Sequence, residues 1–114
     1  MTGTGAIGQL ILQLVLNAGA GETLVVETSR LRRDVAWACG AAQAIAPGEV
    51  PGIDRLYDVV FDCTGAPGAF AVSLALVVPG GRVVVLGSYP VADLAGGNRP
   101  RGVRGLQLGL PRRP

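Results

Sequence analysis

The sequence of 114 residues contains neither histidine nor lysine, and all ten of its positive charges are arginines. Mechanisms in which a histidine or lysine of this chain acts as the base are therefore excluded. Only two cysteines are present, Cys39 and Cys63, and each lies in an apolar run. Two cysteines are too few for a disulfide framework, and we expect both to be buried free thiols.

Long apolar segments are also missing. No stretch of about eighteen apolar residues is free of charge and glycine, so we expect no membrane-spanning helix and no membrane partner. The first residues form a glycine-rich turn instead of a basic segment followed by an apolar one, so we expect no signal peptide and a cytoplasmic location.

Charge is distributed unevenly along the chain. Residues 1–98 hold five arginines against eight acidic residues, whereas residues 99–114 hold five arginines and no acid. We expect one folded segment over residues 1–90 and an irregular, disordered tail rich in arginine, proline and glycine over residues 91–114. The tail arginines could contact phosphates without specificity, but no aromatic residues interleave with them, so we expect no nucleic-acid partner.

Apolar periodicity predicts helices that alternate with strands. The first helix has one apolar face, which Leu12 and Leu16 widen, and it ends before Gly19. The members of that face are Ile7, Leu10, Ile11, Leu14, Val15 and Ala18. Further elements are a strand over 23–27, a helix from the cap Ser29 to Gly40, a weak strand over 43–46, a loop over 47–52, a strand over 58–62, a helix from Pro67 to about Val78, a turn over 79–81 and a strand over 82–87. Apolar strands alternating with helices predict an α/β fold with a parallel, doubly wound sheet covered on both faces.

A glycine motif opens the first helix. Residues 3–8 read GTGAIG, which is GxGxxG. In a dinucleotide-binding turn Gly3 makes the tight bend, Gly5 lets a pyrophosphate approach the backbone, and Gly8 lets the helix pack on the sheet. The free N–H groups of residues 5 to 8, together with the helix dipole, attract the anion.

An acidic residue follows at the expected distance. Glu27 ends the next strand, nineteen residues after Gly8, where the dinucleotide pattern has an acid about twenty residues on. Its carboxylate could bind ribose hydroxyls and repel a 2′-phosphate, which favours NAD over NADP. Arg30, Arg32 and Arg33 weaken this preference, because a guanidinium group can bind phosphate.

Each of these residues also has a structural interpretation. Glycines at a strand–helix turn can serve packing alone, and Glu27 can be a solvated strand end; we favour dinucleotide binding because the features occur together. For Arg32 the two interpretations are equally weighted. We expect Asp58 and Asp62 to be solvated strand ends without a chemical role.

Four successive blocks resemble the zinc-type medium-chain alcohol dehydrogenase/reductase family: GTGAIGQL, RRDVAWACGA, DVVFDCTG and PGGRVVVLG. They follow in order over residues 1–87. The resemblance implies a Rossmann segment of an NAD(P)-dependent oxidoreductase that moves a hydride between the cofactor and an alcohol or carbonyl. The cofactor-binding positions that it implies are Gly3, Gly5, Ala6, Ile7 and Gly8 at the diphosphate, Glu27 at the adenosine ribose, Arg32 beside the adenine, Thr64 and Gly65 bordering the cofactor, and Leu86 and Gly87 nearer the nicotinamide.

The chain departs from the family in several places. Only Met1 and Thr2 precede Gly3, where the family has a complete central strand, and no last strand is evident in the arginine tail, so we expect an incomplete Rossmann-like sheet. The catalytic domain with its zinc ligands has no counterpart here, so we expect no catalytic or metal-ligating residue and no activity from this stretch alone. Members of the family are usually homo-oligomers.

Other functions remain open. A non-catalytic nucleotide-binding remnant, or part of a methyltransferase that binds S-adenosylmethionine, would also have a glycine-rich first turn and an acid after the next strand. A short-chain dehydrogenase is disfavoured, because Ile7 and Gln9 occupy positions where that family needs glycine, and its lysine is missing.

Overall fold

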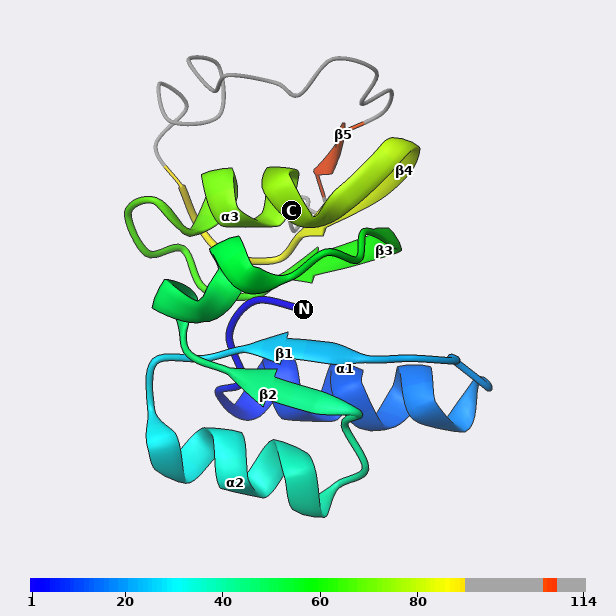
Figure 1. The fold of residues 1–114 in the computed structure, drawn as a ribbon, viewed down its shortest axis with the longest axis vertical. Helices are drawn as coiled ribbons and strands as arrows, with labels where there is room; N and C mark the ends of the chain where they lie inside the picture. Colours follow the sequence, from blue (N-terminus) through cyan, green and yellow to red (C-terminus); the bar gives the residue numbers. More distant parts are fainter. Residues whose placement is uncertain (90–105, 109–114) are drawn as a thin grey trace, which may run out of the picture. The chain divides into compact units, whose positions relative to one another are not determined.

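The computed structural model describes residues 1–89 and 106–108. The chain divides into two compact units, Met1–Asp54 and Arg55–Pro114. Both units contain parallel strands connected through helices, as Figure 1 shows along the colour sequence from blue to red. The expectation of an α/β fold with parallel strands is therefore confirmed.

The first unit consists of two strands and two main helices. Helix α1 (Ala6–Asn17) precedes strand β1 (Leu24–Val26), and helix α2 (Arg30–Ala38) precedes strand β2 (Gln43–Ile45). The two strands pair in parallel, with Leu24, Val25 and Val26 opposite Gln43, Ala44 and Ile45. The helix boundaries agree with the sequence: Ser29 caps α2 by accepting a hydrogen bond from the Arg32 N–H, and Gly19 and Gly40 follow the two helices with positive φ.

The first three residues pair with β1. Thr2 forms an isolated parallel bridge with Val26. The Val26 N–H donates to the Met1 carbonyl over 2.8 Å, and the Gly3 N–H donates to the Val26 carbonyl over 2.9 Å. The backbone just ahead of the glycine turn is thereby fixed to β1, which Glu27 follows directly.

A small apolar core joins α1, β1 and α2. Its buried members are Leu12, Val25, Ala36 and Ala41, and Met1, Leu16, Cys39 and Ala44 pack against it. Fully burying a leucine or valine side chain contributes about 1.5–3 kcal/mol. This core therefore holds the two helices against β1 and sets where the glycine turn lies.

The predicted apolar face of α1 is partly wrong. The helix buries Gly8 and Leu12, whereas Ile7, Leu10 and Leu14 are 61%, 62% and 66% exposed. The sequence AIGQLILQLVLN is apolar on almost every side, so its periodicity does not select one face. Gly8 and Leu12 lie four residues apart on one line of the helix, and Leu12 packs in the core with Val25 of β1.

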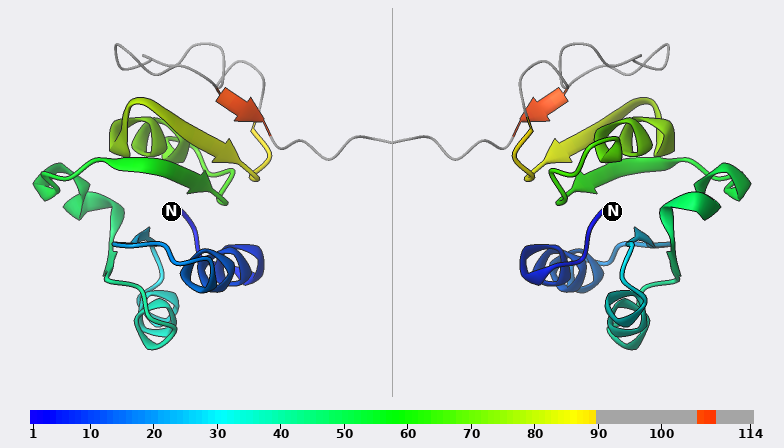
Figure 2. Two further views of the ribbon diagram at one scale, coloured as in Figure 1. Left: turned by 90° about the vertical axis from the view of Figure 1, so that its right-hand side faces the viewer. Right: turned by 90° about the vertical axis from the view of Figure 1, so that its left-hand side faces the viewer.

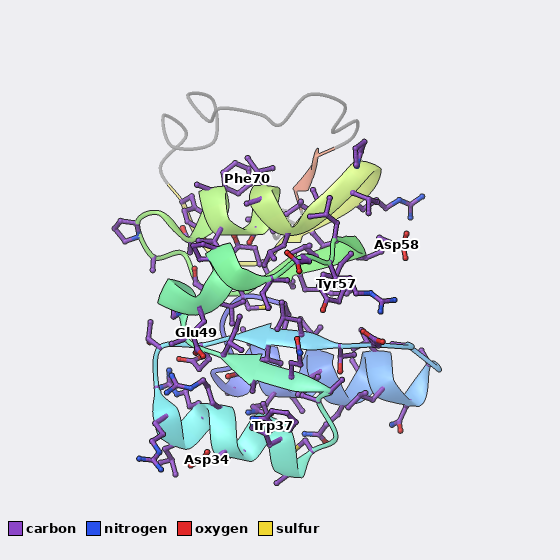
Figure 3. The ribbon with its side chains drawn as sticks, viewed as in Figure 1. Asp34, Trp37, Glu49, Tyr57, Asp58 and Phe70 are labelled. Carbon is purple, nitrogen blue, oxygen red and sulfur yellow. The ribbon has the colours of Figure 1, made fainter. Side chains whose placement is uncertain are left out.

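Residues 47–52, expected to form a loop, form a short 3₁₀ helix, η1 (Pro47–Gly52). The Glu49 side chain accepts a hydrogen bond from the Ala46 N–H over 2.7 Å, and the Glu49 N–H donates to the Ala46 carbonyl. This reciprocal capping orders a segment that its prolines and glycines had led us to expect as a loop. Glu49 is labelled in Figure 3.

The second unit contains a three-stranded parallel sheet. Its order is β3 (Tyr57–Asp62), β4 (Val77–Val85) and β5 (Leu106–Leu108), and the three strands lie side by side in Figure 2. Helix α3 (Ala69–Leu76) packs on β3 and β4 and buries Phe70 and Leu74. Strand β5 corrects the expectation that the arginine tail contains no strand, because its residues pair with Val83 to Val85 of β4. The remainder of the predicted tail lies outside the described residues.

Two other boundaries differ from the sequence prediction. Helix α3 begins at Ala69 after the N-cap Gly68, so Pro67 precedes the helix, and Val77 already belongs to β4. The turn expected at residues 79–81 lies inside β4, where the register with β3 jumps from Tyr57↔Val77 to Val59↔Arg82. Strand β4 pairs with β3 both before and after this irregularity, so the strand continues through residues 79–81.

Candidate functional site

The glycine turn of the first unit leads directly into α1. Gly3 has φ 82°, a left-handed conformation that side chains disfavour, so the bend requires glycine. The first hydrogen bond of the helix runs from the Gln9 N–H to the Gly5 carbonyl over 2.9 Å. The N–H groups of Ala6, Ile7 and Gly8 consequently have no acceptor within the helix.

The start of α1 suits an anion. In this fully described helix no side chain caps the N-terminus, and no acidic residue lies in the first turn. Unpaired N–H groups and the positive end of the helix dipole together favour a negatively charged group such as a phosphate. These N–H groups are therefore free of helical acceptors, and their binding to an anion stays a prediction.

Gly5 is a glycine that the chain itself does not require. Its φ is −66°, which any residue adopts. No heavy atom lies within 4 Å of the position that a Cβ would occupy. Neither backbone conformation nor packing requires the glycine. It is a good N-cap residue, and it would also let a molecule outside the chain approach the backbone closely.

Glu27 lies directly against this turn. The residue is 5% exposed. Oε2 accepts hydrogen bonds from the Thr4 N–H (2.7 Å) and the Thr4 hydroxyl (3.1 Å). Oε1 accepts from the Ser29 N–H (3.0 Å) and the Thr28 hydroxyl (3.2 Å). Because a carboxylate offers about four acceptor positions, these four hydrogen bonds fill them.

These hydrogen bonds keep the carboxylate of Glu27 ionised. Burial acts to raise its pKa, but hydrogen bonds from Ser29, Thr4 and Thr28 outweigh burial and lower the pKa from the ordinary value of 4.5. A negative charge is therefore fixed at the end of β1 at neutral pH. This charge would repel any phosphate group brought next to the Glu27 carboxylate.

The three arginines after β1 have different environments. Arg33 donates from one guanidinium nitrogen to the carbonyls of Glu27 (2.7 Å) and Thr28 (2.8 Å), which holds the turn between β1 and α2. Arg30 and Arg32 are exposed on α2. The Arg32 carbonyl accepts a hydrogen bond from the Gln9 side chain of α1 over 3.4 Å, so Arg32 lies close to the first helix.

In the second unit, the predicted positions after β3 and β4 come together. A Cβ on Gly87 would lie 2.4 Å from the Gly65 nitrogen, and one on Gly65 would lie 2.8 Å from the Ser88 carbonyl oxygen. Both contacts are closer than real Cβ atoms allow, so these two segments touch only because both residues are glycine. The N–H groups of Leu86 and Gly87 donate to the Asp62 carbonyl over 2.7 and 3.1 Å.

Asp62 is not the solvated strand end that we expected. Its side chain is 0% exposed and accepts hydrogen bonds from the Ser73 hydroxyl (3.0 Å), the Tyr89 hydroxyl (2.8 and 3.0 Å) and the Thr64 N–H (3.2 Å). The partners come from α3 and from the segments after β3 and β4, which a strand pattern alone does not bring together. Asp58, in contrast, is exposed as predicted and is labelled in Figure 3.

The donor atoms in the part of the chain that the structure describes do not fit a zinc ion. The sequence has no histidine, and the two free cysteines are half-buried, less enclosed than expected. Burial and the neighbouring Asp62 raise the pKa of the Cys63 thiol to about 11, so it stays protonated at neutral pH, whereas zinc binds thiolate. Within residues 1–89 and 106–108 no three His, Cys, Asp or Glu side chains gather in a way that could hold a metal.

The helices of the described segments are also too short to span a bilayer. None of them combines sufficient length with sufficient apolarity for that purpose.

Parallel strands connected through helices, with a glycine turn at the start of the first helix, define a Rossmann-like α/β protein. A family model described as zinc-binding dehydrogenase matches residues 6–101. The chain belongs to the zinc-binding dehydrogenase family, which confirms the resemblance found in the sequence.

Individual relatives agree with this assignment. L-threonine 3-dehydrogenase of Pyrococcus horikoshii is 34% identical over 98 residues, which cover 79% of this chain and 28% of that protein. A zinc-binding dehydrogenase structure from Sinorhizobium meliloti, with NADP bound, has a TM-score of 0.72 and 31% identity over 78% of this chain and 29% of the other. The structure of 2R,3R-butanediol dehydrogenase of Bacillus subtilis has a TM-score of 0.75 at 21% identity over 96% of this chain and 34% of the other, and shares the fold. The chain thus spans less than a third of the length of the curated relatives it matches.

Proposed function

We propose that this chain binds a dinucleotide, with NAD preferred, and serves as the cofactor-binding part of an oxidoreductase. The bound cofactor would supply hydride transfer to or from an alcohol or carbonyl. The observation that carries the proposal is the open space beside Gly5, next to N–H groups that lack helical acceptors. A diphosphate suits this place by charge, because helix N-termini favour anions.

Within the first unit, the N–H groups of Ala6 and Ile7 would bind the diphosphate, and Glu27 would bind the adenosine ribose. Arg32 would lie beside the adenine. In the second unit, Thr64 and Gly65 would border the cofactor, and the segment of residues 86–87 would lie nearer the nicotinamide. The chain residues proposed here bind and orient the cofactor, and we assign none of them a catalytic role.

The ribose would reach Glu27 by replacing weaker hydrogen bonds. The two bonds from backbone N–H groups, of Thr4 and Ser29, measure 2.7 and 3.0 Å, and the two from hydroxyls measure 3.1 and 3.2 Å. Thr28 is exposed whereas Thr4 is buried, so the Thr28 hydroxyl can rotate into water and release its acceptor position. A ribose hydroxyl would take that position and leave the backbone bonds intact.

The preference for NAD follows from charge. The ionised carboxylate of Glu27 would repel the 2′-phosphate of NADP. Arg33 is engaged with backbone carbonyls, which leaves Arg30 and Arg32 as the cations that could compensate a 2′-phosphate. Since both are exposed, solvent screens their attraction, and we expect NAD to bind more tightly.

Calorimetric titration of the full chain tests this proposal, with NAD, NADP, ADP-ribose and S-adenosylmethionine as separate ligands. We expect saturable binding of NAD and ADP-ribose, weaker binding of NADP, and loss of binding in Gly5→Asp, whose carboxylate would repel the diphosphate. Binding of S-adenosylmethionine without NAD would instead support a methyltransferase segment. If no nucleotide binds, the proposal fails and a non-binding remnant of the family remains.

A further inference from the structure

The buried carboxylate of Asp62 connects three separate segments of the second unit. Through its side chain it binds Ser73 of α3, Thr64 after β3 and Tyr89 after β4. Through its carbonyl it accepts two N–H groups from the segment that follows β4. Asp62 therefore ties the segment after β3 to the segment after β4 through both its side chain and its backbone carbonyl.

Tyr89 is the donor that completes the arrangement. Its hydroxyl lies 2.8 and 3.0 Å from the two Asp62 carboxylate oxygens and 2.8 Å from the Thr64 hydroxyl. A phenol carries one proton, which the carboxylate attracts, so the Thr64 hydroxyl donates to the Tyr89 oxygen. The Ala66 N–H in turn donates to the Thr64 hydroxyl over 3.0 Å. Such a chain of donors strengthens each of its members.

The aromatic ring of Tyr89 has its own support. It lies 5.9 Å from the ring of Phe70 at a tilt of 52°, and Figure 3 shows Phe70 on α3. Packing would therefore keep the ring in place if the hydroxyl were removed. The hydroxyl can be tested separately from the ring.

We propose that Asp62 and Tyr89 are positioning residues that hold Thr64–Gly65 and Leu86–Gly87 in the arrangement needed to receive the nicotinamide end of the cofactor. This inference rests on the proposed function, because it assumes a dinucleotide. It assigns a purpose to a buried carboxylate that the diphosphate and ribose contacts do not use. The two segments touch through glycines where a Cβ would clash with backbone atoms, so a displacement of one segment would displace the other. Small misplacements of binding groups can weaken a bound ligand's positioning strongly.

The test compares two ligands in four proteins: the unmodified chain, Tyr89→Phe, Ser73→Ala and Asp62→Asn. NADH contains the nicotinamide and reports on it by fluorescence, whereas ADP-ribose lacks that ring. Tyr89→Phe removes the hydroxyl that bridges the two segments. Ser73→Ala is the matched control, since it removes one donor to the same carboxylate from the α3 side and none from either loop.

We expect Tyr89→Phe to weaken NADH binding about tenfold, to reduce the enhancement of nicotinamide fluorescence, and to leave ADP-ribose binding within about twofold of the unmodified chain. Ser73→Ala should lower the melting temperature and leave the ratio of the two affinities unchanged. Asp62→Asn replaces one acceptor oxygen with an NH₂ group that faces other hydrogen-bond donors. We expect it to weaken NADH binding more than Tyr89→Phe does.

The outcomes separate the two proposals. If the unmodified chain binds neither NADH nor ADP-ribose, the proposed function fails and this inference fails with it. If the chain binds both, and Tyr89→Phe weakens both equally or neither, only the positioning role is refuted. The positioning role would also be refuted if Ser73→Ala and Tyr89→Phe changed the ratio of NADH to ADP-ribose affinity equally. The hydrogen bonds around Asp62 would then stabilise the fold in general and not the two loops in particular.

Discussion

Replacing Gly5 with alanine separates a ligand role from a structural one. The backbone φ of −66° suits alanine, and the new methyl group meets no heavy atom within 4 Å. Alanine caps a helix less well than glycine, by roughly 1 kcal/mol. It also restricts the unfolded chain, which stabilises the fold by about 0.4–1 kcal/mol. The free energy of unfolding should therefore change by less than about 1 kcal/mol.

Dinucleotide binding should respond far more strongly. The methyl group of Gly5→Ala would occupy the space where we place the diphosphate and move it away from the N–H groups of Ala6 and Ile7. A hydrogen bond to a charged group contributes about 1.5–3 kcal/mol. Losing two of them weakens binding by about 3–6 kcal/mol, which is roughly a hundredfold to ten-thousandfold in affinity.

The assay is calorimetric titration with NAD beside a thermal melt of the same sample. Gly21→Ala is the matched control, because Gly21 is exposed, has no positive φ and also has no heavy atom within 4 Å of an added Cβ. We expect that variant to bind NAD normally. If Gly5→Ala binds NAD as Gly21→Ala does, no diphosphate lies against Gly5. If Gly5→Ala instead lowers the free energy of unfolding by more than about 3 kcal/mol, Gly5 has a structural role and the argument from its open surroundings is refuted.

Three further predictions concern the side chains around the two loop ends. Thr28→Ala frees one acceptor position on Glu27, so NAD affinity should be retained or rise up to about fivefold in the same titration, and a fall beyond about threefold would contradict the ribose exchange. The lowered pKa of Glu27 means that its contribution to folding stability is present above about pH 4.5 and is lost as the pH falls further. In urea melts across that range, the free energy of unfolding of Glu27→Gln should depend less on pH than that of the unmodified chain. An unchanged pH dependence would contradict an ionised Glu27 that stabilises the fold. Burial, followed by contact with Asp62, raises the pKa of Tyr89 to about 12. Its contribution to folding stability is therefore present below pH 10 and is lost as the pH rises toward 12. Ultraviolet titration should show one of the two tyrosines ionising late, and Tyr89→Phe should remove that step.

Local signals in the sequence predicted most of the first unit. The glycine motif, the Ser29 cap and the β-branched run before Glu27 each act within a few residues, and the structure contains the turn, α2 and β1 where these signals place them. The buried line of α1 could not be predicted in the same way. A helix that is apolar on almost all sides acquires its orientation from the strand that it packs against.

The second unit depends more on contacts between distant residues. Asp62 resembles an ordinary strand end in the sequence, and only the meeting of Ser73 and Tyr89 around it makes it a buried residue. Strand β5 has three residues among arginines and glycines, and its pairing with β4 supplies the order that its own sequence does not indicate. One available clue was the pair Gly65 and Gly87, since two glycines after neighbouring parallel strands suggest a close approach of their backbones.

The central claim is that backbone N–H groups at the start of α1 bind a diphosphate. Its most direct test follows the amide resonances of the ¹⁵N-labelled chain by nuclear magnetic resonance while ADP-ribose is added. We predict saturable shifts that are largest at Ala6, Ile7 and Gly8, with Gly21 unaffected. Shifts that cluster elsewhere, with these three amides unmoved at saturating ligand, would contradict the account.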